Sequence, residues 1–195
     1  EALSLELVLA THNAHKVKEV AAILEPIVPG LSMLGYDGPE PVEDGTTFLE
    51  NSLIKARAAF AHTGKASIAD DSGIAVEILG GSPGIFSARW SGAKDDVKNR
   101  QLLLAQLADV PEGNRQASFI CTISMVSEAG EQSFTGVCPG RIAFAESGEN
   151  GFGYDPIFIP EGFEVTTGEL EPMVKNSISH RSMALSQLAS FLRPQ

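Results

Sequence analysis

The segment 69–75, which reads Ala-Asp-Asp-Ser-Gly-Ile-Ala, constrains this chain more than any other. Its adjacent carboxylates, Asp70 and Asp71, and the hydroxyl after them stand where an apolar strand predicted over residues 66–69 ends, directly before a glycine. Carboxylates at a strand end can hold a hard divalent cation such as Mg²⁺, which takes oxygen ligands and commonly brings substrate phosphates with it. The segment therefore predicts a sheet protein with a metal-assisted site at a strand end.

The two carboxylates are not expected to play the same role. Successive side chains of an extended chain point to opposite faces, so only one of Asp70 and Asp71 can face a ligand directly. The other is expected to hold the turn or a neighbouring backbone N–H. The alternative is an Asp-rich turn that binds no metal.

The start of the chain predicts a strand, a tight turn and a helix. Residues 5–10 form an apolar run with β character. Apolar residues then recur at helical spacing, at Val17, Val20, Ala21 and Leu24. Thr11 or Asn13 is expected to cap this helix.

The rest of the chain continues as mixed α/β structure. Residues 35–45 predict a loop, and Thr47 and Glu50 fit a capping box at the start of a helix. Further strands are expected over 74–78, 119–126, 132–137, 141–144 and 156–159, and further helices over 95–107 and from about residue 179. We therefore expect an α/β fold, an elongated mixed sheet with helices, whose ligands bind at strand ends.

Charge and composition exclude several kinds of partner. The 195 residues carry 14 Lys and Arg against 25 Asp and Glu, a formal net charge of −11. Because duplex nucleic acid is bound largely by neutralising its phosphates, we expect no nucleic-acid partner. No apolar run reaches the roughly 18 residues of a membrane span and no signal-peptide pattern is visible, so we expect a cytoplasmic protein without a membrane partner. Cys121 and Cys138 belong to no CxxC pair and are expected in the core.

The turn before the first helix is a candidate phosphate-binding segment. A helix N-terminus offers backbone N–H groups and a positive dipole end to an anion, and Lys16 adds a charge. The turn lacks the glycines of a Walker A loop, and its two histidines lack a third ligand for a metal. The alternative is a capped helix with one surface lysine. The residues of this turn are Thr11, His12, Asn13, Ala14, His15 and Lys16.

More charged groups lie between this turn and the acidic pair. Glu43 and Asp44 form a second acidic pair, and Glu50 and Lys55 lie on the helix that follows. Each has an ordinary alternative, namely a solvated loop, a helix cap and a surface lysine. If the carboxylates converge on one Mg²⁺, they form a metal site.

The segment 151–156, Gly-Phe-Gly-Tyr-Asp-Pro, is a candidate for binding a planar ligand. Glycines on both sides of an aromatic residue let the backbone come close to such a ligand. Phe152 or Tyr154 can stack on a base, which is worth roughly 1–3 kcal/mol; the alternative is a turn before a core strand. Arg181, beside His180, lies near a helix start, where the dipole disfavours a cation, and this mismatch favours a functional role.

Together these segments resemble the inosine/xanthosine triphosphate pyrophosphatase family. The match covers nearly the whole chain in order, and so many motifs in register are not expected by chance. The matching motifs are Thr11-x-Asn13-x-x-Lys16, Thr47-Phe48-x-Glu50-Asn51-x-x-x-Lys55-Ala56, Ala69-Asp70-Asp71-Ser72-Gly73, Gly80-Gly81-x-Pro83-Gly84, Ser87-Ala88-Arg89, Gly151-Phe152-Gly153-Tyr154-Asp155-Pro156, Glu169-Leu170, Lys175-Asn176 and Ser179-His180-Arg181.

The resemblance implies a single domain over residues 1–195, with two lobes around a long mixed sheet and a nucleotide cleft between the lobes. It also implies a homodimer and Mg²⁺ as cofactor. Family members convert a non-canonical purine nucleoside triphosphate (ITP, dITP or XTP) and water into the monophosphate and pyrophosphate. The chain is thereby expected to cleanse the nucleotide pool.

The resemblance also implies roles for the matching residues. Glu43 and Asp71 would hold Mg²⁺, with Asp44 and Glu50 as outer or alternative ligands. Asp71 would also deprotonate the attacking water, and Lys55 would help to neutralise the phosphates. The residues expected to bind the substrate are Thr11, His12, Asn13, Ala14, His15 and Lys16 at the phosphates, Ser72, and Phe152, Gly153, Tyr154, Asp155, Lys175, His180 and Arg181 around the base.

Two positions depart from the family pattern. His12 stands where many members have glycine, and Val174 stands where an acidic residue often precedes the lysine. Two other functions stay open: a nucleotide-binding or sensing module without turnover, and the same chemistry on a pyrimidine or modified triphosphate.

Overall fold

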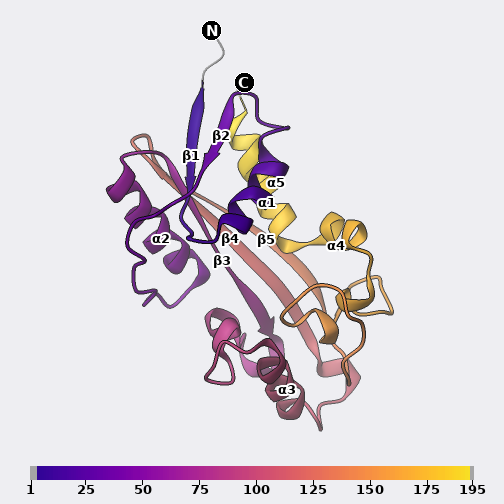
Figure 1. The fold of residues 1–195 in the computed structure, drawn as a ribbon. Coiled ribbons are helices and arrows are strands. Elements are labelled where there is room, and N and C mark those ends of the chain that lie inside the picture. Colours follow the sequence, from indigo (N-terminus) through magenta and orange to yellow (C-terminus); the bar gives the residue numbers. More distant parts are fainter. Residues whose placement is uncertain (1–3, 194–195) are drawn as a thin grey trace. The chain divides into compact units, whose positions relative to one another are not determined.

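The computed structural model describes residues 4–193 (Figure 1). Its strands are β1 Leu5–Leu9, β2 Leu31–Leu34, β3 Ser67–Val76, β4 Gln116–Ser127, β5 Gly130–Ile142 and β6 Phe158–Pro160. Its α-helices are α1 Ala14–Leu24, α2 Phe48–Thr63, α3 Asp96–Gln106, α4 Pro172–Ile178 and α5 His180–Leu192. Short 3₁₀ turns lie at Glu77–Leu79, Gly84–Arg89, Glu112–Asn114, Asp155–Ile157 and Thr167–Glu169.

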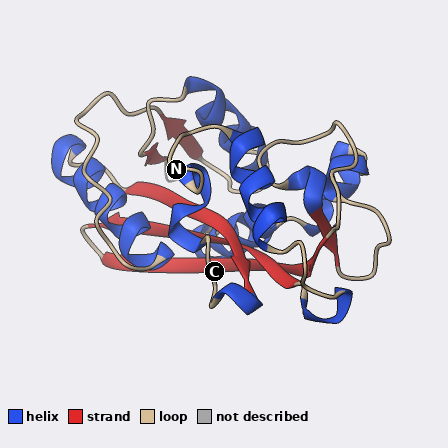
Figure 2. Ribbon diagram, turned by 90° about the horizontal axis from the view of Figure 1, so that it is seen from below, coloured by secondary structure: helices blue, strands red, loops and turns tan. Residues whose placement is uncertain are grey.

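The strands form one mixed sheet in the order β2-β1-β3-β4-β5-β6. Strand β1 runs parallel to β2 and to β3, whereas β5 and β6 are antiparallel. Helices flank the strands (Figure 2), so the predicted α/β class is confirmed. Among the described helices, none combines the length and the apolar character needed to cross a membrane.

The described chain divides into two compact units. Unit 1 holds residues 4–71, 122–135 and 184–193, and unit 2 holds residues 72–121 and 136–183. Strands β3, β4 and β5 each contribute residues to both units.

In the core of unit 1, helix α2 packs against strands β1, β3 and β4. Val8 of β1 is buried with Ala59 of α2 and Tyr36, and Ala56 of α2 is buried with Ala69 and Val126. Small residues on the buried face of α2 let this helix lie close to the strands.

Side-chain caps define where the helices of unit 1 begin. Asn13 caps α1 by accepting hydrogen bonds from the backbone of His15 and Lys16, as predicted. Thr47 caps α2 by accepting from Glu50 N–H, as predicted. The Glu50 carboxylate also accepts from Thr46 N–H.

The core of unit 2 lies among β3, α3, β4, β5 and β6. Its buried apolar members are Ile74, Val76, Leu103, Leu107, Ala117, Cys138, Ile142, Tyr154, Ile157 and Phe158. Cys121 and Cys138 are both buried, as expected. Arg115 is also fully buried, which the sequence analysis did not anticipate.

Strand β3 differs most from what the sequence predicts. Two strands with a turn between them were expected, but residues Ser67–Val76 form one continuous strand with Asp70 and Asp71 inside it. Gly73 was expected directly after the end of a strand, whereas it lies inside β3 and allows a close approach of other backbone. A Cβ at Gly73 would lie 2.4 Å from both Gly84 O and Ser87 Oγ. Glycine within a strand often marks such an approach of other backbone.

Other boundaries also differ from expectation. Strand β5 is continuous over Gly130–Ile142, where two strands with a break were predicted. Strand β6 begins at Phe158 because the preceding residues, Asp155–Ile157, form a 3₁₀ turn. Strand β2 and helix α4 were not predicted, whereas α3 and the start of α5 lie where expected.

Candidate active site

The turn between β1 and α1 is held by its own side chains. Thr11 Oγ1 accepts from Asn13 N–H at 3.1 Å, and Asn13 Oδ1 accepts from the backbone of His15 at 3.0 Å. The cap leaves Asn13 and His15 on the surface, while Lys16 is half-buried. The ammonium of Lys16 lies 2.5 Å from a carboxylate oxygen of Asp70. An ion pair therefore fixes the one cation of this turn beside β3.

His12 is directed toward the loop that follows β2. Its Nε2 lies 2.6 Å from Gly38 O, and its Nδ1 lies 3.2 Å from a Glu40 carboxylate oxygen. Its ring also lies 5.8 Å from the ring of Tyr36. His12 thus joins the turn to the loop at residues 36–40.

Asp70 and Asp71 have different partners, as the alternation of a strand predicts. The Asp70 carboxylate pairs with Lys16 of α1, whereas Asp71 lies among groups contributed by α2 and the loop before it. Asp71 Oδ2 is buried and has no hydrogen-bond partner. Burying a carboxylate oxygen without a partner is costly, so a further group is needed to stabilise it.

Burial raises the pKa of Asp71 from 3.8 to about 6. The positive charge of Lys55 lowers this pKa, while the negative charge of Glu43 raises it; a hydrogen bond from Asn51 lowers it again. A carboxyl group with a pKa near neutrality can accept a proton from water more readily than an ordinary aspartate.

Lys55 and Asn51 of α2 connect the acidic groups. Lys55 Nζ lies 3.2 Å from a Glu43 carboxylate oxygen and donates to Asp70 O at 2.5 Å. Asn51 is buried, and its Oδ1 accepts from Gly45 N–H at 2.9 Å. In the sequence, Asn51 stood out only as a member of the motif with Glu50 and Lys55, without a role of its own. That motif was the available signal that Asn51 lies among these charged groups.

The two other carboxylates predicted as outer or alternative ligands, Glu50 and Asp44, differ in their surroundings. Glu50 is engaged at the start of α2, where it accepts from both Thr46 N–H and Thr46 Oγ1, and these bonds lower the pKa of its carboxyl group. Asp44 is exposed. Within residues 4–193, no group of three or more His, Cys, Asp or Glu side chains is arranged to hold a metal.

A site built on Glu43 and Asp71 nevertheless fits Mg²⁺. This cation usually keeps several waters and is bound through one or two carboxylates together with substrate phosphates. The two carboxylates lie beside the same Lys55, and the buried Asp71 Oδ2 lacks a hydrogen-bond donor. The donor set therefore matches a cation that needs its substrate to complete its coordination.

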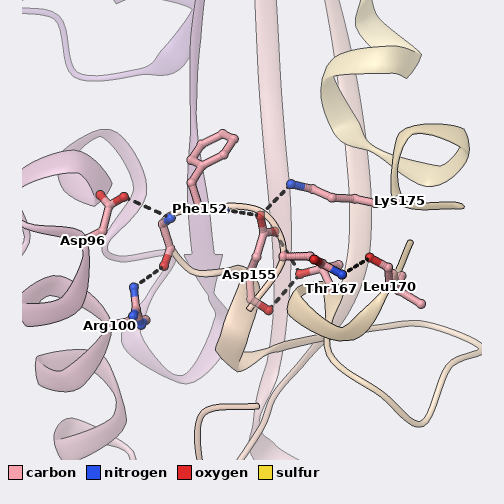
Figure 3. A network of polar contacts seen from close by, with 9 residues as sticks. Asp96, Arg100, Phe152, Asp155, Thr167, Leu170 and Lys175 are labelled. Atoms are coloured by element: carbon pink, nitrogen blue, oxygen red, sulfur yellow. Dashed lines mark hydrogen bonds and ion pairs between the residues drawn. The ribbon is translucent and has the colours of Figure 1, made fainter. Parts of the chain in front are cut away.

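The predicted base-binding loop lies in unit 2 and surrounds a buried carboxylate (Figure 3). Asp155 accepts from Phe152 N–H at 2.9 Å, from Thr167 Oγ1 at 2.9 Å and from Lys175 Nζ at 2.5 Å. A Cβ at Gly151, where φ is +75°, would lie 2.1 Å from Asp155 Oδ2. Asp155 thus organises the loop, and glycine is required at 151.

The two aromatic residues of this loop are placed differently. The Phe152 side chain is 68% exposed, with Lys175 Nζ 4.9 Å from its ring centroid. Tyr154 is buried, and its hydroxyl donates to Ser87 O at 2.6 Å. Of the two rings expected to stack on a base, only that of Phe152 is therefore presented at the surface.

The other predicted substrate residues of unit 2 lie on α5 and β3. His180 begins α5, and its ring stacks on Phe119 with centroids 5.0 Å apart and planes 13° apart. Arg181 follows it and is half-buried, as is Ser72 of β3. The stacking fixes the plane of the His180 ring.

Comparison with known proteins identifies the family. Residues 7–191 match the Ham1 family, and the chain belongs to this family. A protein of Leifsonia xyli subsp. xyli named dITP/XTP pyrophosphatase is 53% identical over 191 residues, which are 97% of this chain and 96% of that protein. A protein of the same name from Mycobacterium bovis is 46% identical over 198 residues, or 98% and 97% of the two chains. The resemblance stated from the motifs is thereby confirmed.

Solved structures show the same fold. The structure of a HAM1 protein from Coxiella burnetii has a TM-score of 0.90 at 38% identity and covers 96% of this chain and 98% of its own. The Ham1 protein of Staphylococcus aureus has a TM-score of 0.86 at 38% identity, with coverages of 96% and 97%. The α/β architecture is thus shared along nearly the whole chain.

Proposed function

We propose that this chain is a Mg²⁺-dependent nucleoside-triphosphate pyrophosphatase. It converts ITP, dITP or XTP and water into the nucleoside monophosphate and pyrophosphate, and so removes non-canonical purine nucleotides. The observation that carries the proposal is the buried, unpartnered Asp71 Oδ2 beside Glu43 and Lys55. The name dITP/XTP pyrophosphatase, borne by relatives 53% and 46% identical to this chain, supports the choice of substrate.

Glu43 and Asp71 would hold the cation, with Asp44 and Glu50 as outer or alternative ligands. When bound, Mg²⁺ would polarise the phosphoryl oxygens and make water a better nucleophile. The engagement of Glu50 at the helix start makes it the weaker of the two alternatives.

The residues of unit 1 would carry out the hydrolysis. Asp71 takes a proton from water, the water oxygen bonds to phosphorus, and the anhydride bond between the α and β phosphates breaks to release pyrophosphate. Lys55 offsets the negative charge of the phosphates. The turn from Thr11 to Lys16 binds them with the ammonium of Lys16, which Asp70 holds in place, while the Asn13 cap occupies the N–H groups of His15 and Lys16. Catalysis of phosphoryl transfer depends mainly on positioning the reacting groups and compensating their charge.

The residues of unit 2 would recognise the base. The exposed ring of Phe152 stacks on it, while Asp155 and Lys175 hold the loop and Tyr154 anchors it in the core. Donors from His180 and Arg181 would meet the 6-keto oxygen of hypoxanthine or xanthine. Adenine places an amino group there, so a donor of the protein would face a donor of the base. Such a mismatch can lower kcat/KM for the wrong base by roughly 10⁴-fold.

The proposal extends to the setting in which the enzyme works. The net charge of −11 argues against a nucleic-acid partner, whereas a small phosphorylated substrate needs only a few placed cations and a metal. No membrane partner is proposed. A nucleotide-pool enzyme acts in the cytoplasm, where free triphosphates occur. Ser72 is proposed to contact the substrate, and the chain is proposed to act as a homodimer.

A panel of triphosphates tests the proposal. The protein is incubated with Mg²⁺ and ITP, dITP, XTP, ATP, GTP or a pyrimidine triphosphate, and pyrophosphate and orthophosphate are measured separately. Pyrophosphate from the first three, with little from ATP, is expected. Tight binding without turnover would identify a sensing module, preference for a pyrimidine would change the substrate, and orthophosphate would place the cleavage at another bond.

A further inference from the structure

The backbone N–H and C=O groups of Phe152 and Gly153 are hydrogen-bonded within unit 2 (Figure 3). Phe152 N–H donates to Asp155 Oδ2 at 2.9 Å, and Phe152 C=O accepts from Asp155 N–H at 3.1 Å. Gly153 N–H donates to Asp96 Oδ2 at 3.1 Å, and Gly153 C=O accepts from Arg100 Nη1 at 3.2 Å. Neither residue therefore has a backbone donor left for a ligand, although Phe152 itself is 68% exposed.

Two side chains of α3 hold the polar groups of Gly153. Asp96 and Arg100 are four residues apart on the helix, so they lie on the same face about one turn from each other. Asp96 supplies an acceptor for the N–H of Gly153, and Arg100 supplies a donor for its C=O. Arg100 also forms an ion pair with Glu146, and its side chain is only 17% exposed.

The conformation of Gly153 suits this contact. Its φ of +60° lies in the left-handed region, which residues with a Cβ rarely adopt. The α3 side chains therefore hold a backbone conformation that is special to glycine, directly after the aromatic residue. Fixing this peptide restricts the backbone from which the Phe152 side chain projects.

We propose that Asp96 and Arg100 are positioning residues that fix the ring of Phe152 for stacking on the base of the substrate. The loop offers a ring face and no backbone donors from residues 152 and 153, so recognition of the base edge falls to side chains outside it. The stacking partner rests on the proposed function, whereas the contact of α3 with Gly153 does not.

The first test is amide hydrogen exchange at Gly153, measured by NMR on the full chain without substrate. In Asp96→Ala the exchange of this amide is expected to be faster by about tenfold or more, because its acceptor is lost. Arg57→Met, which removes an exposed ion pair with Glu131 in unit 1, is the matched control and should leave it unchanged. Unchanged exchange in Asp96→Ala would overturn the proposal.

The second test separates positioning from general destabilisation. With dITP and Mg²⁺, Asp96→Ala and Arg100→Met are expected to raise KM about tenfold. This factor lies near the low end of the affinity that stacking on one base contributes. The kcat should stay within about twofold of the wild type. Asp96→Asn keeps an acceptor oxygen and should retain the wild-type KM. Glu146→Gln tests whether the ion pair alone matters and should also retain it. An unchanged KM in Asp96→Ala, or an equal rise of KM in Arg57→Met, would contradict the proposal.

The two tests also keep this inference apart from the proposed function. If the wild-type chain releases no pyrophosphate from any triphosphate, the proposed function fails, and exchange at Gly153 still decides whether α3 holds the loop. If the wild-type chain is active and Asp96→Ala behaves like Arg57→Met in both tests, the positioning role is wrong and the proposed function stands.

Discussion

Lys55 Nζ lies 3.2 Å from a carboxylate oxygen of Glu43, which joins the middle of α2 to the loop before it. The same ammonium donates to the backbone carbonyl of Asp70 in β3. Its charge lowers the pKa of Asp71, while the charge of Glu43 raises it. One lysine thus offsets the charge of both carboxylates that we propose as cation ligands.

Replacing Lys55 should therefore change both the rate and its pH dependence. In Lys55→Met we expect kcat to fall by about 10²-fold, as when one preorganised donor is removed from a reacting phosphate. The acidic limb of the rate profile should move to higher pH, because the group that lowers the pKa of Asp71 is gone. Steady-state rates across pH measure both effects. Lys65→Met, which removes an exposed ion pair with Glu6, is the control. A limb that stays in place would contradict the role of Lys55.

Asp71 should make the metal-free protein less stable as pH rises. Folding raises the pKa of this group from 3.8 to about 6, so the folded state binds the proton more tightly than the unfolded state. The resulting stabilisation is complete below the unfolded pKa and is lost as pH rises through the folded value. At pH values above 7, Asp71→Asn should thus raise the free energy of unfolding by about 1–3 kcal/mol, at ~1.4 kcal/mol per pKa unit.

Urea unfolding in the presence of EDTA at acidic and neutral pH measures this effect. Asp70→Asn is the matched control, because Asp70 is paired with Lys16 and its substitution should lower stability at neutral pH. If Asp71→Asn were as destabilising as Asp70→Asn, the prediction would be wrong. The ionised Asp71 carboxylate would then be stabilised by its protein partners in the absence of a cation.

Arg115 should be required for the stability of unit 2. Its buried guanidinium donates to the backbone carbonyls of Leu107, Val110, Ile142 and Ala143. Arg115→Met removes the donors that these four carbonyls share and leaves buried acceptors underpaired, so we expect a loss of about 3–5 kcal/mol in the free energy of unfolding. Chemical denaturation measures the loss. Arg141→Met is the control, because the ion pairs of Arg141 are with largely exposed glutamates, and it should change stability by less than about 1 kcal/mol.

Phe152 should affect substrate binding without affecting stability. Phe152→Ala is expected to raise KM by about 10- to 100-fold, the value of one stacked base, while Phe152→Trp keeps a ring and much of the affinity. Phe86 is a matched control, since it is also an exposed ring, with the Arg89 guanidinium 5.4 Å from its centroid. Steady-state kinetics with dITP compares the variants. Equal KM values for Phe152→Ala and Phe86→Ala would rule out stacking on Phe152.

Local patterns predicted much of this structure from the sequence. The caps at Asn13 and Thr47 and the extent of α3 follow from short-range rules that depend on a few neighbouring residues. The different surroundings of Asp70 and Asp71 follow from the period of a strand. These features could be predicted because distant parts of the chain do not alter them.

The features that were missed depend on contacts between distant segments. Polar residues and Gly73 inside β3 suggested a turn, because the sequence does not reveal that Lys16 pairs with Asp70 or that Gly84 approaches Gly73. Likewise, the spacing of aromatic residues could not tell the exposed ring of Phe152 from the buried ring of Tyr154. The hydrogen bonds from Asp96 and Arg100 of α3 to Gly153 could be found only in the tertiary structure.

The dependence of pyrophosphate release on Mg²⁺ tests the central claim most directly. Release from dITP would be followed over a Mg²⁺ titration for the wild type, Glu43→Gln and Asp71→Asn. We predict no release with EDTA, a half-maximal Mg²⁺ concentration raised about tenfold or more in Glu43→Gln, as expected when a metal site loses one carboxylate, and no detectable turnover in Asp71→Asn. Release by the wild type in EDTA, or the same Mg²⁺ dependence in all three proteins, would contradict the claim that these two carboxylates bind the cation.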